Sequence, residues 1–134
     1  MKGRALQNIL SANSAYATAL GSDPNGGIKL YPSASVPQGA VRPYATYTLV
    51  SRPESQNKSG RGIYTANIQI DHYANTQDQA EELDDLCFIA LNRYSGTEEG
   101  VKIMDVRGEG ASEGFNEGQE SYYRTTEFSF KIHP

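Results

Sequence analysis

The segment from Ile63 to Tyr73, IYTANIQIDHY, constrains the fold more than any other part of the chain. Its residues alternate between a mostly apolar set and a mostly polar set: Tyr64, Ala66, Ile68, Ile70 and His72 against Ile63, Thr65, Asn67, Gln69, Asp71 and Tyr73. Because successive side chains of a strand point to opposite faces, this pattern predicts a long strand in a sheet that is covered on one side only. The other face should be polar, which suits a docking surface or a ring as well as a pocket.

Two segments have the apolar spacing of amphipathic helices. The first runs from Gly3 to Leu20 and ends at a turn rich in glycine; its stripe is Leu6, Ile9, Leu10, Ala17 and Leu20. The second is capped by Asn75 or Thr76 and runs to the region of Arg93. Its inner stripe is Ala80, Leu83, Cys87, Ala90 and Leu91, and its carboxylates are expected mostly on the solvated outer face: Glu81, Glu82, Asp84 and Asp85.

Four further strands are predicted, at residues 28–31, 44–50, 101–107 and 122–132. Phe128, Phe130 and Ile132 should point inward from the last of them. Strands 44–50 and 63–73 are expected to form one hairpin, and strands 101–107 and 122–132 another. The predicted fold is therefore α+β, with two helices packed on one face of a mostly antiparallel sheet. The 134 residues should form a single domain, 1–134.

Composition excludes several classes of function. A net charge of −4 and a pI near 5.1 argue against a general nucleic-acid binder, although not against a protein that lets DNA slide past it. The single cysteine, Cys87, permits no intrachain disulfide and indicates a cytosolic setting. No apolar run approaches the ~20 residues that span a membrane. Nine tyrosines suit interfaces, but tyrosine also suits strands.

The residues that carry chemistry do not form a recognisable site. Asp71 and His72 are adjacent on a strand and point to opposite faces, and His133 is next to the C-terminus, so no metal site is predicted. Cys87 and His72 are better explained as core residues than as a nucleophile and its base. We therefore expect no catalytic residues, no cofactor and no enzymatic activity. The alternative is a small-molecule pocket between the second helix and the sheet, near His72, Cys87 and Tyr64.

Two long connections differ in charge, and both exceed the usual length of a hairpin loop. The first, from Ser51 to Gly62, contains Arg52, Glu54, Lys58 and Arg61. The second, from Gly108 to Ser121, contains Glu109, Glu113, Glu117 and Glu120 and no basic residue. They are predicted either to be solvated hairpin tips or to become ordered against a partner. These eight charged residues are the candidate binding residues of the chain.

The order of several short motifs resembles that of the tail-completion proteins of long-tailed bacteriophages, which join tail to head and are also called tail terminators. The motifs cover nearly the whole chain: a short N-terminal helix before a glycine-rich turn, Ile28-Lys29-Leu30-Tyr31-Pro32, Pro37-Gln38-Gly39-Ala40, Pro43-Tyr44-Ala45-Thr46-Tyr47, Ala66-Asn67-Ile68-Gln69-Ile70-Asp71, and Asn75-Thr76-Gln77-Asp78-Gln79-Ala80-Glu81. They are structural rather than catalytic.

The resemblance implies a virion protein, assembled in the host cytoplasm, that forms a hexameric ring. Such a ring would cap the tail tube, end tail polymerisation and dock to the head-side connector or stopper protein, while DNA passes through its lumen without specific binding. The four glutamates could repel DNA in the lumen, and the Arg52–Arg61 stretch could meet an acidic neighbour. Alternatives are a head-closure protein, another neck or tail-tube ring component, or the small-molecule-binding domain.

Overall fold

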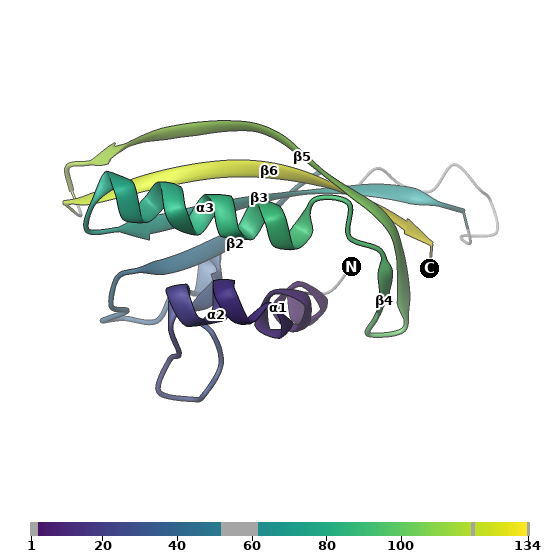
Figure 1. Cartoon of the computed structure of the whole chain (residues 1–134), viewed down its shortest axis with the longest axis horizontal. Coiled ribbons are helices and arrows are strands. Elements are labelled where there is room, and N and C mark those ends of the chain that lie inside the picture. Colours follow the sequence, from purple (N-terminus) through teal and green to yellow (C-terminus); the bar gives the residue numbers. More distant parts are fainter. Residues whose placement is uncertain (1–2, 52–61, 119, 134) are drawn as a thin grey trace.

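The computed structural model describes residues 3–51, 62–118 and 120–133 and places six strands in one sheet, in the order β1-β2-β3-β6-β5-β4 (Figure 1). The strands are β1 (Leu30–Pro32), β2 (Tyr44–Ser51), β3 (Tyr64–Ala74), β4 (Gly96–Glu98), β5 (Val101–Asn116) and β6 (Ser121–His133). β1 runs parallel to β2, whereas the other neighbouring pairs are antiparallel. β2 and β3 form the first predicted hairpin, and β5 and β6 form the second.

Helices cover one face of this sheet, and the other face is left open (Figure 1). The helices are α1 (Gly3–Ala12), α2 (Ser14–Leu20) and α3 (Gln77–Leu91), with a short 3-10 helix, η1 (Ser33–Ser35), after β1. The α+β class is thus confirmed, but the prediction of one helix over residues 3–20 is wrong. Asn13 has extended backbone angles, and its side chain accepts a hydrogen bond from the Tyr16 N–H at 3.0 Å, so a new helix begins there.

The core lies between the helices and the covered face of the sheet. Inward residues of β3 and β6 are buried as their alternation predicted, including Ile70, Phe128 and Phe130. The inner stripe of α3 packs on them through Leu83, Cys87 and Leu91. Thr76 caps this helix, because its hydroxyl accepts a hydrogen bond from the Gln79 N–H at 3.1 Å.

β5 is much longer than predicted, and this corrects the expectation of a loop from Gly108 to Ser121. The strand continues to Asn116 beside β6, so only residues 117–120 connect the two strands. Its register shifts between Ile103 and Asp105 and again between Glu109 and Ala111. Gly110 has a φ of 56° at the second shift, a left-handed conformation that glycine adopts without strain. The hydrophobic alternation that signals a strand is absent from this stretch, so the sequence pattern missed it.

Candidate functional site

The four glutamates of the predicted acidic connection do not share one surface. Glu109 pairs with Glu127 in the β5–β6 ladder, whereas Glu113 pairs with Arg124. In a regular strand, residues four apart lie on the same face, but the bulge after Glu109 inserts one residue and sends the two side chains to opposite faces. Glu109 therefore lies on the open face, where it accepts a hydrogen bond from Ser129 Oγ at 3.3 Å.

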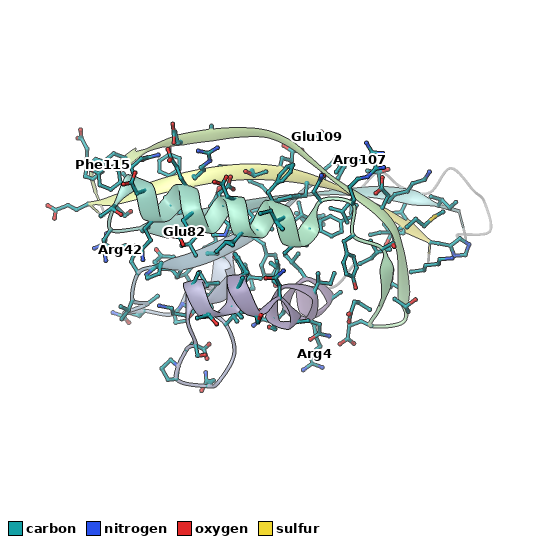
Figure 2. The ribbon with its side chains drawn as sticks, in the orientation of Figure 1. Arg4, Arg42, Glu82, Arg107, Glu109 and Phe115 are labelled. Atoms are coloured by element: carbon teal, nitrogen blue, oxygen red, sulfur yellow. The ribbon has the colours of Figure 1, made fainter. Side chains whose placement is uncertain are left out.

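Glu113, on the covered face, accepts hydrogen bonds from Gln77 of α3 and from Arg124 Nη1, the latter at 3.5 Å. Glu117 and Glu120 follow in the exposed turn, where the Glu120 carbonyl accepts a hydrogen bond from Arg42 at 2.9 Å. Figure 2 shows Glu109 well away from Phe115, which marks the far end of β5. The acidic residues are thus divided among the open face, the α3 side and the hairpin tip.

The basic connection cannot be placed in the same way. Its four charged residues, Arg52, Glu54, Lys58 and Arg61, lie outside the described residues. Two exposed hydrophobic residues, Val50 and Ile63, lie close to the described ends that flank this segment.

A network of charged and polar groups lies beneath α3, and sequence reasoning missed it. Asp84, which was expected mostly on the solvated face, is 4% exposed. Its Oδ2 accepts a hydrogen bond from Arg124 Nε at 3.0 Å, and its Oδ1 accepts one from Thr126 Oγ1 at 2.6 Å. Arg124 Nη1 also lies 3.8 Å from Glu81 and 3.5 Å from Glu113. Arg124 thus joins three carboxylates from α3 and β5, which holds the end of the β5–β6 hairpin against the helix.

Next to this network, His72 is fully buried and neutral. Tyr16 Oη lies 2.8 Å from His72 Nε2, and burial lowers the histidine pKa from 6.5 to about 3. Nδ1 has no hydrogen-bond partner and lies 3.9 Å from Asp84 Oδ1. That separation would suit an ion pair with a protonated ring, but Asp84 already pairs with Arg124 and the cost of burying a charge dominates, so the ring stays neutral.

The structure places two residues of the predicted alternative pocket, His72 and Cys87, inside the core. His72 and Cys87 are 0% exposed within the core, and burial raises the pKa of the Cys87 thiol, with Asp84 adding to the effect. A thiol of this kind is inert rather than nucleophilic. In the part of the chain that the structure describes, no group of three or more His, Cys, Asp or Glu residues is placed to hold a metal ion. None of its helices is long and apolar enough to cross a membrane.

Hollows are found at the surface instead. One of about 620 Å³ lies between residues 22–25 and 37–41, with Lys29 and Tyr31 in its wall. Asp23 in that wall already accepts hydrogen bonds from the Asn25 and Gly27 N–H groups at 2.9 and 3.1 Å. A smaller hollow of about 220 Å³ lies beside β5 and is lined by Asp84, Asp85, Phe88, Gly110, Arg124 and Thr126. Neither presents a set of convergent reactive groups.

The open face of the sheet is polar except for a row of tyrosines. Tyr44 and Tyr73 stack with ring centroids 5.2 Å apart, and Tyr123 continues the row at 6.3 Å from Tyr73. Beside them Asp71 is buried by its neighbours and accepts hydrogen bonds from Thr125 Oγ1 and Gln69 Nε2. Ring stacking and side-chain hydrogen bonds therefore hold these residues of the open face in defined positions.

Large apolar side chains are exposed at several separate places. The most exposed are Ile89 on the back of α3 (72%), Val41 (69%), Leu49 (52%), Val50 (49%), Ile63 (49%) and Phe115 (46%). Leu49 and Val50 are consecutive residues near the end of β2, and Ile63 lies just before β3.

Comparison with known proteins shows which fold this chain resembles. No protein-family model and no curated protein sequence matches the chain. Among solved structures, a chain in "Virion of native gene transfer agent (GTA) particle" matches with a TM-score of 0.79 and 13% sequence identity, over 98% of this chain and 93% of that chain. At this identity the likeness shows the fold alone. The chain therefore shares its fold, over nearly its whole length, with a protein of a gene transfer agent virion.

Proposed function

We propose that this chain is a structural virion protein that forms a ring at the head-proximal end of a phage tail tube. In that position it would end tail polymerisation and join the tail to the head connector. The observation that carries the proposal is the full-length match, at a TM-score of 0.79, to a chain of a gene transfer agent virion. The order of sequence motifs, which resembles that of tail-completion proteins, supports the same role independently of the structural match.

The partners in this proposal are five further copies of the chain, the tail tube protein and a head-side connector or stopper protein. A non-enzymatic role agrees with a network in which the polar groups of Asp84, Arg124 and Thr126 are already bonded to one another. The protein would be assembled in the host cytoplasm and carried in the neck of the virion. DNA would pass through the ring without being bound by sequence.

The charged connections have proposed roles in this ring. Arg52 and Arg61 would meet an acidic surface of a neighbouring ring or tube, so charge reversal at both positions should abolish tail joining. If the double-reversal variant joins tails as well as the wild type does, this role is excluded. Glu109 on the open face, and Glu117 and Glu120 in the following turn, would keep DNA from adhering, because like charges repel phosphate. Glu113 is bonded to Gln77 and Arg124 instead.

The experiment is negative-stain imaging of the purified protein mixed with tail tubes from a phage mutant that lacks it. We expect rings at one end of each tube, and tubes of uniform length when the protein is present during assembly. A clean monomer that leaves tubes bare would contradict the terminator role. Binding to the head connector but not to tubes would identify a head-closure component instead.

A further inference from the structure

We propose that neighbouring copies join through two free sheet edges, with β5 of one copy receiving β2 of the next. This inference rests on the proposed ring. It assigns the subunit contact to the end of β2, around Leu49 and Val50, and to the far half of β5, from Glu109 to Phe115.

In the part of the chain that the structure describes, each edge has an unpaired stretch because the outermost strands, β1 and β4, are short. Among the described residues, β1 pairs only with Ala45–Tyr47 of β2, so residues 48–51 have no strand on that side. On the opposite edge of the sheet, β4 pairs only with Val101–Ile103. The next part of β5 is covered by the end of α3, because the Arg93 N–H bonds to the Val106 carbonyl and the Gly108 N–H to the Asn92 side chain.

From Glu109 to Phe115, β5 is described with β6 alone beside it (Figure 1). In an antiparallel pair every second residue directs its N–H and C=O away from its partner, and such a row can pair with another strand. A long free edge that is not covered within its own subunit is expected to be covered in the assembly.

The two edges are complementary in direction and in shape. β2, β3, β6 and β5 alternate in direction, so β2 of a following copy would lie antiparallel to β5 and continue the same pattern. Leu49 pairs with Ile68, a buried residue of the helix-covered face, yet it is 52% exposed. The hollow lined by Phe88 and Gly110 lies at the receiving edge, where a glycine leaves room for a side chain from the next copy.

The geometry of closure also fits a head-to-tail contact. The contact uses two different surfaces of each copy, as a ring with cyclic symmetry requires. Pairing residues 48–51 with 109–115 staggers successive copies by a few residues, because β1 occupies the place beside Ala45–Tyr47. A stagger of this kind is what tilted strands need in order to close into a cylinder.

The test is cross-linking of rings bound to tail tubes. Thr48 pairs with Gln69 and Ser112 with Thr125, which places both on the open face at the two edges. The double variant Thr48→Cys/Ser112→Cys, treated with a short bismaleimide, should give covalent multimers up to a closed ring, at least tenfold above either single variant. Cys87 is fully buried and stays in place. The control pair Ile89→Cys/Ser112→Cys should give no ladder.

A second variant does not depend on the register. Leu49→Asp should leave the fold intact and reduce ring occupancy of tube ends at least tenfold, whereas Val41→Asp, at another exposed apolar residue, should not. The edge contact would be overturned if Leu49→Asp forms rings normally. It would also be overturned if the Thr48→Cys/Ser112→Cys variant forms rings but gives no cross-linked ladder above the control pair. Either result would leave the proposed function standing. Wild-type protein that makes no rings on tubes would instead overturn the proposed function, and the edge contact with it.

Discussion

His72 is held in the core as an uncharged ring, and this makes the stability of the domain sensitive to mild acid. Its pKa is about 3 in the folded chain and about 6.5 when unfolded. Below pH 6.5 the unfolded chain therefore binds a proton that the folded chain does not bind. The free energy of unfolding is fully retained above this pH and is lost as the pH falls from 6.5 towards 3.

We expect a loss of about 1 kcal/mol from this residue between pH 7 and 5.5, before most carboxylates titrate. Urea denaturation across that range measures it. The variant His72→Gln should be less stable than the wild type at pH 7, but its free energy of unfolding should fall less between pH 7 and 5.5 by that amount. Equal slopes in the His72 variant and the wild type would show that the folded ring takes up its proton over the same pH range as the unfolded chain.

Asp84 and Asp85 are adjacent carboxylates with opposite environments. Asp84 is buried and bonded to Arg124 and Thr126, whereas Asp85 is exposed. Asp84→Ala leaves a partly buried guanidinium and a buried hydroxyl without their acceptor, so it should cost about 2–3 kcal/mol of unfolding free energy. Asp85→Ala is the matched control and should change it by less than about 0.5 kcal/mol. Similar losses for the two variants in chemical denaturation would contradict the network.

At the scale of elements, β5 needs glycine at the positions where an aromatic side chain packs directly against its backbone. Gly108 lies under Phe88 of α3, and a Cβ placed there would overlap that ring and approach Phe128 to 3.2 Å. Gly108→Ala should therefore destabilise the domain by about 1–2 kcal/mol, since Phe88 is partly exposed and can move. Gly118→Ala, in the turn where the nearest contact of a Cβ is 3.5 Å, is the control for thermal denaturation. If Gly108→Ala is as stable as Gly118→Ala, the Phe88 side chain of α3 does not pack closely against Gly108 of β5.

The elements that the sequence predicted well are those with a regular apolar period. β3 alternates, α3 has a single apolar stripe, and both were placed within a residue or two. β5 beyond Arg107 has no such period, because it is glycine-rich, bulged and covered through rings from other elements. The break between α1 and α2 depends on one asparagine cap within a continuous helical pattern. Asp84 was misplaced because its burial depends on Arg124, which is distant in sequence.

At the scale of the whole molecule, α1, α2 and α3 cover one face of the sheet and the other face is open (Figure 1). A ring closed through sheet edges would direct one of these faces to the channel. We expect this to be the open face, because its polar side chains and tyrosine row need no cover and because Glu109 and Glu127 lie side by side on it. Figure 2 shows one carboxylate of each surface: Glu109 on β5 belongs to the open face, and Glu82 on α3 belongs to the helical face.

Neutralising each surface distinguishes the two orientations. Glu109→Gln/Glu127→Gln removes two negative charges per copy from the open face, so DNA phosphates should adhere and the efficiency of ejection should fall at least tenfold. Glu82→Gln/Asp85→Asn removes the same charge from the back of α3 and should leave ejection unchanged. Infectivity of complemented phage, with tail length and head joining checked by imaging, gives the readout. A loss confined to the α3 variant would place the helices around the channel, and no loss in either variant would remove electrostatic repulsion as a function of these carboxylates.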